Sequence, residues 1–208
     1  MKNNGAILIF SGCAGSGKGT VLSRLTELDG RFRPTVSLTT RTPRPGEVHG
    51  VNYYYTTRED FLEQVRQGNM TEYAEYCGNL YGTLTSEIHR LTQEGRVAVL
   101  EIETAGARQI MEKFPQHRSI FIAPPSYTVL EKRLRGRGTE TEEQLHNRLE
   151  AAKEEILLCR HYQHLVINHD GAVEESARAI LALMNGLPTQ DLPIYPDKEA
   201  FIDHFLTH

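Results

Sequence analysis

Residues 12–20 combine glycine, lysine and threonine in a pattern suited to holding phosphate. The stretch Gly12–Lys18 has the form G-x-x-x-x-G-K and follows the apolar run 6–10. Glycine allows backbone N–H groups to point toward an anion, and the N-terminus of a following helix adds partial positive charge. The lysine can reach the outer phosphates of a nucleotide. The pattern predicts a nucleoside triphosphate site, and the alternative is a plain glycine-rich turn between a strand and a helix.

One position departs from the usual form of this loop. The Ser or Thr that normally follows the lysine, as a magnesium ligand, is Gly19 here, with Thr20 next. Adjacent helical residues point about 100° apart, so Thr20 is not a simple substitute. Cys13 lies where a helix N-terminus can make a thiol more acidic, but we interpret it as a small space-filling residue. The predicted loop comprises Gly12, Cys13, Ala14, Gly15, Ser16, Gly17, Lys18, Gly19 and Thr20.

A second candidate anion site follows in residues 41–53. Arg41 and Arg44 are three residues apart, next to prolines, and Tyr53 follows them. Proline fixes the backbone and lowers the entropy lost when a loop orders. Two guanidinium groups and a phenol match the oxygens of one phosphate group. The chemistry alone leaves a phosphate site and a solvated surface loop equally open.

The elements that must position these residues follow an α/β pattern. Apolar runs alternate with segments of helical period, which indicates a mainly parallel sheet. Buried strands are expected at 6–10, 97–102, 119–123 and 164–168, and helices near 18–28, 104–113, 126–136, 141–160 and 172–185. Thr141 and Gln144 form a predicted capping box, and one face of the helix that they start carries Leu145, Leu149, Ala152 and Ile156.

Two regions differ from this pattern. Residues 35–95 are rich in Thr, Arg, Tyr, Pro and Gly, which predicts a small, partly antiparallel insertion. After Gly186 a proline-rich stretch predicts an extended connector. One or two helical turns are then expected, with Phe201, Ile202, Phe205 and Leu206 on one side. This tail could dock on its own domain, mediate oligomers or stay mobile.

Composition limits the classes of function. The chain has 208 residues, a formal net charge of −4 and three cysteines, which favours one domain in a reducing, cytoplasmic setting. The charge argues against a general nucleic-acid or membrane-surface partner. No run approaches the ~20 apolar residues that a membrane span needs. The oligomeric state stays open.

Four stretches together resemble guanylate kinase: "SLTTRTPRPGEVHGVNYYY", "EYAEYCGNLYGT", "FIAPPS" and "RLRGRGTETEEQLHNRLEAA". The resemblance covers about residues 5–185 in order. It implies a P-loop NTPase fold with a central parallel sheet flanked by helices. The core would comprise 1–34 and 96–187, with a helical lid near 134–150 and a mixed α/β GMP-binding insertion at 35–95. Residues 188–208 would be a C-terminal extension of unknown role.

The resemblance also implies an activity and a set of site residues. Guanylate kinases transfer the γ-phosphoryl group of ATP to GMP with Mg²⁺. Arg41, Arg44, Tyr53 and Tyr81 would hold the GMP phosphate, while Ser37, Glu72 and Thr83 would read the base. Glu47 and Glu103 would complete the GMP site. Lys18, Arg133 and Arg137 would contact the ATP phosphates, Arg148 the transferred group, and Asn168 the region of the adenine. Magnesium would be held through phosphates and water, with Thr20 and Glu101 as candidate side chains.

Some features leave alternatives open. Glu101 and Glu103 replace residues that are often aspartates in the family, and Ala105 replaces a common glutamine. Without the resemblance, Glu72 in the alternating "TEYAEYC" would be placed on the exposed face of a strand. One rival function is a non-catalytic guanylate-kinase-like interaction module. Another is a related P-loop kinase that acts on a phosphorylated sugar.

Overall fold

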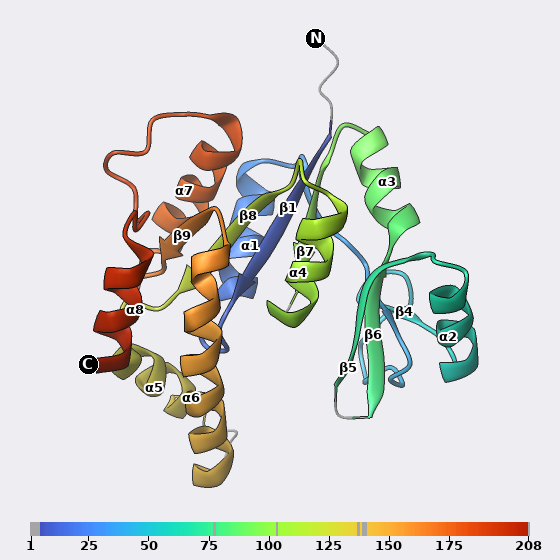
Figure 1. Ribbon diagram of the computed structural model, residues 1–208, viewed down its shortest axis with the longest axis horizontal. Coiled ribbons are helices and arrows are strands. Elements are labelled where there is room, and N and C mark those ends of the chain that lie inside the picture. The colour runs from blue at the N-terminus through green and yellow to red at the C-terminus, as the bar shows by residue number, and fades with distance from the viewer. Residues whose placement is uncertain (1–4, 77, 103, 137, 139–140, 208) are drawn as a thin grey trace. The chain divides into compact units, whose positions relative to one another are not determined.

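The computed structural model describes residues 5–76, 78–102, 104–136, 138 and 141–207 of an α/β protein (Figure 1). Its five-stranded sheet has the strand order β2-β7-β1-β8-β9, and its four-stranded sheet the order β4-β3-β6-β5. The chain divides into two compact units. The first unit joins the residues up to Ile9 to Arg31–His117, and the second joins Phe10–Gly30 to the chain from Arg118 onward.

The strands of the larger sheet are those that the apolar runs predict. The four expected strands are confirmed as β1 (Ala6–Gly12), β7 (Val97–Glu101), β8 (Arg118–Ala123) and β9 (His164–Ile167). The pairing of β8 with β9 is parallel, and so is that of β7 with β2 (Phe32–Pro34). Only Phe32 is buried in β2, so this short strand carries no apolar run that would predict it. Nearly continuous burial along the other strands is typical of a parallel sheet.

The expected helices are also present. They are α1 (Lys18–Leu28), α4 (Thr104–Lys113), α5 (Tyr127–Arg135), α6 (Glu142–Leu157) and α7 (Val173–Asn185), with a 3₁₀ turn η1 (Leu158–His161) after α6. The capping box at α6 is confirmed, because Thr141 Oγ1 accepts from the Gln144 N–H and Gln144 Oε1 accepts from the Thr141 N–H. The predicted apolar face of α6 is buried. In the described part of the chain, no helix is long and apolar enough to cross a bilayer.

The smaller sheet confirms a partly antiparallel region within residues 35–95. Its strands are β3 (Leu38–Thr39), β4 (Tyr54–Tyr55), β5 (Met70–Tyr76) and β6 (Asn79–Leu84). β6 pairs antiparallel with β3 and β5, whereas β3 and β4 are parallel. The region also contains α2 (Arg58–Arg66) and α3 (Thr85–Gln93), which agree with the mixed α/β insertion that the resemblance implies, although the sequence analysis gives no ranges for them. For α2 a signal exists, since Thr57 caps the helix by accepting from the Asp60 N–H.

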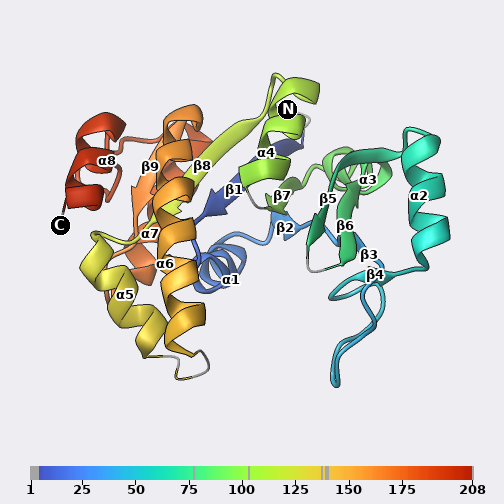
Figure 2. The same ribbon diagram turned by 60° about the horizontal axis from the view of Figure 1, so that its bottom comes forward.

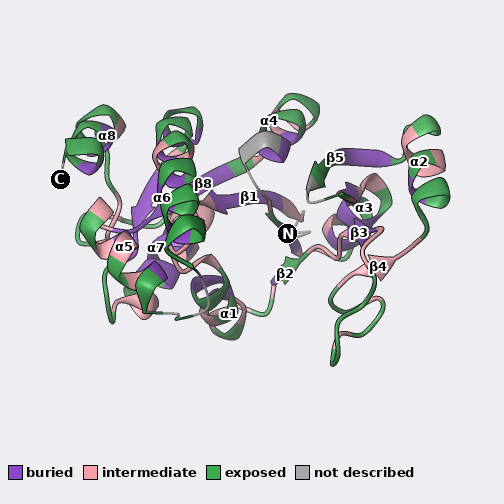
Figure 3. Cartoon of the chain, turned by 90° about the horizontal axis from the view of Figure 1, so that it is seen from below, coloured by how far each residue is buried: buried purple, intermediate pink, exposed green. Residues whose placement is uncertain are grey.

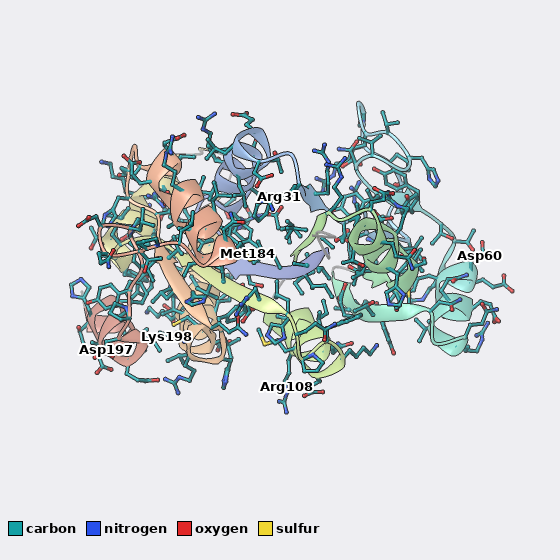
Figure 4. The ribbon with its side chains drawn as sticks, turned by 90° about the horizontal axis from the view of Figure 1, so that it is seen from above. Arg31, Asp60, Arg108, Met184, Asp197 and Lys198 are labelled. Carbon is teal, nitrogen blue, oxygen red and sulfur yellow. The ribbon has the colours of Figure 1, made fainter. Side chains whose placement is uncertain are left out.

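The C-terminal tail docks on its own unit. Helix α8 (Lys198–Thr207) packs against α6 and η1 (Figure 1). Asp197, labelled beside Lys198 in Figure 4, caps it by accepting from the Ala200 N–H at 3.0 Å. Its buried residues are Phe201, Ile202 and Phe205. The prediction for Leu206 is wrong: this side chain is 41% exposed, because it lies about 100° around the helix from Phe205.

The connector before α8 pairs with the last strand of the larger sheet. The Ile167 N–H donates to Pro193 O at 2.8 Å, and the Tyr195 N–H donates to Leu165 O at 2.9 Å. Val166 and Ile194 form an isolated antiparallel bridge between these two bonds. The connector is extended, as predicted, and it covers the outer edge of β9.

Replacing Phe205 with alanine is expected to lower the free energy of unfolding by about 3–5 kcal/mol, the usual cost of removing a buried phenyl ring. Phe205 is fully buried, and its ring lies edge-on to that of Tyr127 in α5, with centroids 6.1 Å apart. Urea unfolding followed by circular dichroism measures the change. The matched control is Leu206→Ala, an exposed neighbour whose loss should cost less than about 0.5 kcal/mol. Equal costs for the two variants would contradict the docking of α8.

Candidate active site

The predicted phosphate loop joins β1 to α1 in the second unit. Gly17 is the N-cap of α1 and has a left-handed backbone with φ of 87°. A Cβ atom at this position would lie 2.5 Å from Nδ2 of Asn168. Glycine is therefore required at this residue both by the backbone conformation and by the close approach of a side chain. The loop ends at the N-terminus of α1, and the first amide groups of a helix lack partners within it and can bind an anion.

Two side chains of the loop can interact with phosphate oxygens. The Lys18 ammonium donates to the carbonyl oxygen of Gly12 and, at 3.3 Å, to that of Cys13. The Ser16 hydroxyl is buried, and it has no hydrogen-bond partner among the residues that the structure describes. A buried hydroxyl without a partner costs free energy, so this site favours a ligand that supplies one. An ammonium and a hydroxyl in a loop of backbone amides suit an anionic ligand.

The side chain of Asn168 contacts the backbone of the phosphate loop. It directly follows β9 and is 4% exposed. Its Nδ2 donates to Ser16 O at 2.8 Å, and its Oδ1 accepts from the Ser176 hydroxyl at 3.2 Å. Both ends of the amide are therefore bonded to protein. The structure places Asn168 against the phosphate loop, which makes it a support for the loop backbone.

Arg133, at the end of α5, lies against the same loop. Its Nη2 donates to Asn168 O and to Asp170 Oδ1, each at 2.7 Å, and its Nη1 donates to Gly15 O at 3.4 Å. The guanidinium lowers the pKa of the Asp170 carboxyl below its ordinary value. Arg133 therefore lies at the edge of the loop, and its predicted contact with ATP phosphates stays a prediction.

The unusual positions of the loop have distinct environments. Gly19 is exposed, and a Cβ atom added there would meet nothing within 4 Å, so packing does not require this glycine. Thr20 is exposed in the first turn of α1. Cys13 is fully buried, and burial raises the pKa of its thiol to about 12. Because the thiol stays protonated at neutral pH, the space-filling interpretation of Cys13 fits its environment.

The predicted lid at 134–150 includes the end of α5 and the first part of α6, and these two helices lie side by side in Figure 2. Arg137 lies outside the described residues. Arg148 is exposed on α6. Arg135, which the sequence leaves as a solvated charge, pairs with Glu131 on its own helix at 3.0 Å and with Glu142 of α6 at 2.7 Å. It therefore links the two helices within the predicted lid.

The second candidate site lies on one face of the smaller sheet, in the first unit. Side chains on the face toward α2 form an apolar core of Leu38, Phe61, Met70 and Leu80. Strand pairs place Thr39 opposite both Tyr55 and Tyr81, and Glu72 opposite Thr83. Because side chains alternate between the faces of a sheet, these residues share the other face. We call Thr39, Tyr55, Glu72, Tyr81 and Thr83 the polar face.

Glu72 is a buried acid on the polar face. It is 6% exposed, and its Oε1 accepts from the Thr83 hydroxyl at 2.8 Å. On α4, a Cβ atom at Gly106 would lie 2.8 Å from Glu72 Oε2, so a larger residue there would displace this carboxylate. Burial raises its pKa above the ordinary value. The expectation of an exposed residue from simple alternation is wrong, and Figure 3 shows the first part of β5 as buried.

Glu47 bonds to both arginines of the candidate anion site at residues 41–53. Its Oε1 accepts from Arg41 Nη2 at 2.9 Å, and their side chains are only 19% and 14% exposed. Its Oε2 accepts from the Arg44 backbone N–H and from the Tyr55 hydroxyl, each at 2.8 Å. The Arg41 guanidinium and the Arg44 N–H lower the pKa of Glu47 to about 2. Glu47 therefore acts as an anionic support for the loop, and Arg44 itself is exposed.

Two tyrosines lie beside Arg41. The Tyr53 and Tyr81 rings meet edge to face with centroids 6.0 Å apart, and Arg41 Cζ lies 5.3 Å from the Tyr53 centroid. Burial raises the pKa of the Tyr53 phenol. Ser37 directly precedes Leu38, so alternation puts its side chain on the side of the polar face. The residues predicted to hold the GMP phosphate thus lie next to those predicted to read the base.

Two predicted site residues lie in neither the phosphate loop nor the smaller sheet, and the structure adds two residues that the sequence analysis did not name. Glu101 is exposed at the end of β7, and Glu103 lies outside the described residues. Sequence reasoning missed Tyr55 and Gly106. The run Tyr53-Tyr54-Tyr55 could have revealed Tyr55, since residues two apart in a strand share a face. No local signal marks Gly106, because its role depends on packing of α4 against β5.

Comparison with known proteins agrees with this geometry. Residues 4–185 match the family model described as guanylate kinase. A guanylate kinase of Lactococcus lactis is 46% identical over 168 residues, which cover 81% of this chain and 82% of the relative. One of Streptococcus pneumoniae is 46% identical over 169 residues, 81% of each chain. The crystal structure of guanylate kinase from Anaplasma phagocytophilum, 30% identical, covers 99% of this chain and 97% of its own with a TM-score of 0.70. The chain therefore belongs to the guanylate kinase family.

Proposed function

We propose that this chain transfers the γ-phosphoryl group of ATP to GMP, giving ADP and GDP. The observation that carries the proposal is the buried carboxylate of Glu72, held by Thr83 on the same sheet face as Tyr81. Burying a carboxylate is costly unless hydrogen-bond donors compensate it. A base with N–H donors on two neighbouring nitrogens supplies them, and guanine has this pattern in its ring N1–H and its 2-amino group.

Glu72, Ser37 and Thr83 are the proposed readers of the base. Guanine carries O6 as an acceptor, with the ring N1–H and the 2-amino group as donors. Glu72 can accept from both nitrogens, and the Ser37 hydroxyl can donate to O6. The Thr83 hydroxyl has one proton, which it donates to Glu72 in this structure, so it would have to turn from Glu72 to donate to O6. Adenine presents an amino group in place of O6 and lacks the N1–H, so it would leave the buried carboxylate without donors. A site of this kind can reject the wrong base by a factor on the order of 10⁴.

Arg41, Arg44, Tyr53 and Tyr81 are the proposed ligands of the GMP phosphate. Guanidinium groups make paired, charge-assisted hydrogen bonds to phosphate oxygens. Glu47 does not suit direct contact with the phosphate, since its two oxygens already accept three hydrogen bonds and it is negatively charged. We propose instead that Glu47 fixes the orientation of the Arg41 guanidinium. Glu103 remains a proposed member of the GMP site from the resemblance alone.

The loop Gly12–Thr20 is the proposed binding site for the ATP phosphates. Backbone amides and Lys18 would neutralise their charge, and the Ser16 hydroxyl would gain a partner. We further propose that Arg133, Arg137 and Arg148 stabilise charge on the phosphates and on the transferred group. Asn168 belongs to the ATP site as a support for the loop.

The proposed mechanism relies on alignment and charge neutralisation. A phosphate monoester has a second pKa near 6, so the GMP phosphate is mostly a dianion at neutral pH and needs no general base. Lys18 and the arginines stabilise negative charge on the transferred group. Water competes with GMP for the γ-phosphoryl group. Closure of the lid and of the GMP-binding region before transfer would exclude water and so prevent hydrolysis of ATP.

Mg²⁺ fits this chemistry as an ion that comes with the ATP phosphates. The hydroxyl of Thr20 and the carboxylate of Glu101 are the oxygen donors that suit a small hard cation, directly or through water. When bound, such an ion neutralises phosphate charge.

We also propose residues 1–34 and 96–187 as the nucleotide-binding core, 35–95 as the GMP-binding insertion, and 134–150 as the lid. Residues 188–208 form the extension that covers β9.

An acceptor panel tests the proposed function. The purified protein would be incubated with ATP, Mg²⁺ and, in turn, GMP, AMP, CMP, UMP and a sugar phosphate, with ADP measured by a coupled assay. We expect kcat/KM for GMP to exceed that for AMP by at least about 10³. A reaction without acceptor corrects for hydrolysis of ATP. Tight GMP binding in calorimetry without ADP formation would indicate a non-catalytic module, and turnover of the sugar phosphate alone would indicate a different kinase.

A further inference from the structure

Strand β5 contains an extra residue immediately before its functional acid. Met70 lies opposite Leu84 of β6, and Glu72 lies opposite Thr83. Two steps along β5 therefore correspond to one step along β6, and Thr71 is the additional residue. This is a β-bulge, a feature that commonly re-aims a side chain beside an active site.

The bulge decides which face of the sheet carries Glu72. Met70 packs in the apolar core with Phe61. In a regular strand, residue 72 would share that face with residue 70, because side chains repeat every two residues. The extra residue instead turns Glu72 to the polar face, where it meets Thr83. Loss of the bulge would move the carboxylate to the apolar core, since a slip of one residue exchanges the faces.

Lys113 holds the backbone at this point. It is the last residue of α4, and its ammonium donates to Met70 O at 2.9 Å and to Thr71 O at 2.6 Å. A bulge disrupts the regular strand ladder, so its carbonyls need other donors. The ammonium group has three donors and satisfies two adjacent carbonyls at once. The Thr71 side chain is fixed separately by the Thr85 hydroxyl at 2.9 Å.

The same helix also fits against the carboxylate. Gly106 leaves room for Glu72 Oε2, and Lys113 follows seven residues later, two turns along the same face of α4. One helix face therefore touches both the carboxylate and the two carbonyls that precede it in the strand. Helix α4 therefore contacts β5 at both of these points.

We propose that Lys113 is a positioning residue for guanine selection: it fixes the bulge at Thr71 and so holds Glu72 on the polar face. The inference rests on the proposed function, because it assigns a supporting residue to the same base-reading site. Lys113 acts through the backbone of β5, and the fidelity of base selection depends on how firmly it holds that backbone.

Two variants of Lys113 and one matched control test this inference. Lys113→Met removes the donors, and Lys113→Arg keeps charge and donors. Arg108→Met changes a basic residue of the same helix that is 86% exposed along its side chain, pairs with Glu112, and points away from the protein in Figure 4. For each variant, kcat, the KM values for GMP and ATP, and the ratio of kcat/KM for GMP over AMP would be measured.

We expect Lys113→Met to lower kcat/KM for GMP by about 10- to 100-fold, mainly through KM, since small misplacements of a binding group have effects of this size. The ratio of GMP over AMP should fall at least about tenfold, while the KM for ATP changes less than about twofold. Lys113→Arg should recover most of the ratio. Arg108→Met should match the wild type.

Two results would overturn the inference. One is an unchanged GMP-to-AMP ratio in Lys113→Met, even where the melting temperature falls, because that indicates a purely structural role. The other is a Lys113→Arg variant as impaired as Lys113→Met. If Lys113→Met does not fold, Lys113→Gln, which keeps one donor group, should show an intermediate ratio, and a wild-type ratio would again overturn the inference.

Failure of the proposed function has a different signature. In that case the wild type itself would form no ADP with GMP. The role of Lys113 is then judged from GMP affinity in calorimetry: a weaker affinity in Lys113→Met than in Arg108→Met would support it, and equal affinities would overturn it.

Discussion

Replacing Lys18 with alanine is expected to lower kcat for ATP and GMP by at least about 10³-fold, the scale at which loss of a charge stabiliser acts in phosphoryl transfer. The ammonium is half-buried and bonded to the carbonyls of Gly12 and Cys13, which holds it within the loop. Phosphate oxygens of ATP would take the place of these carbonyls. GMP binding should be nearly unchanged, since Lys18 belongs to the proposed ATP site.

Steady-state kinetics with both substrates and calorimetry with GMP alone measure these effects. Lys153→Ala is the matched control, because it removes a partly exposed lysine of α6 that pairs with the exposed Glu150. It should retain wild-type kcat. A Lys18→Ala variant with kcat within about tenfold of the wild type would exclude the proposed role of the phosphate loop.

Replacing Glu72 with glutamine is expected to lower kcat/KM for GMP by about 10²- to 10³-fold. Glutamine has nearly the same shape, but it presents an NH₂ group where guanine also presents donors. One donor would face another in a buried site, and neither could be satisfied. The KM for ATP should not change. Unchanged turnover of GMP would instead favour the sugar-phosphate kinase, which has no use for this carboxylate.

The same substitution should not weaken the fold. Burial raises the pKa of Glu72 in the folded state, so the folded chain holds this proton more strongly than the unfolded chain does. The ionised group therefore costs stability, and the cost grows as the pH rises from the ordinary pKa of glutamate through the raised value. Glu72→Gln lacks this cost, and we expect its melting temperature at pH 7.5 to equal or exceed that of the wild type.

The pH dependence of GMP use provides a second measurement. Guanine needs the ionised carboxylate, so kcat/KM of the wild type should fall as the pH drops through the raised pKa of Glu72. The GMP phosphate also titrates near pH 6, but it does so equally for both proteins. The ratio of wild type to Glu72→Gln thus isolates the carboxylate. Glu75→Gln, on the exposed part of β5 and paired with Arg58, is the control and should behave as the wild type.

The phosphate loop could be predicted because its determinants are local. Residues 12–20 are contiguous, and a strand followed by a helix is enough to place them. The capping box of α6 is equally local, since Thr141 and Gln144 are three residues apart. Apolar runs likewise suffice for buried parallel strands. In each case the chemistry and the geometry are contained in one short window of sequence.

The polar face could not be predicted from residue patterns alone. The orientation of Glu72 depends on the bulge at Thr71, which exists only in the pairing of β5 with β6. The contact of Glu47 with Arg41 spans six residues of irregular loop, where no period applies. Lys113 reaches β5 across more than forty positions of sequence. Resemblance to a family supplied Glu72, but neither resemblance nor periodicity indicated what holds it.

The pairing of the connector with β9 gives the exposed linker 186–190 a particular importance. The outer edge of β9 is covered only because Pro193 and Tyr195 bond to it. A single proteolytic cut in the linker would allow the connector to dissociate from β9. The edge of β9, with its apolar residues Leu165, Val166 and Ile167, would then be exposed. Exposed apolar edges recruit strands from other molecules. One nick is thus expected to make the chain prone to aggregation without altering any residue of the two proposed nucleotide sites.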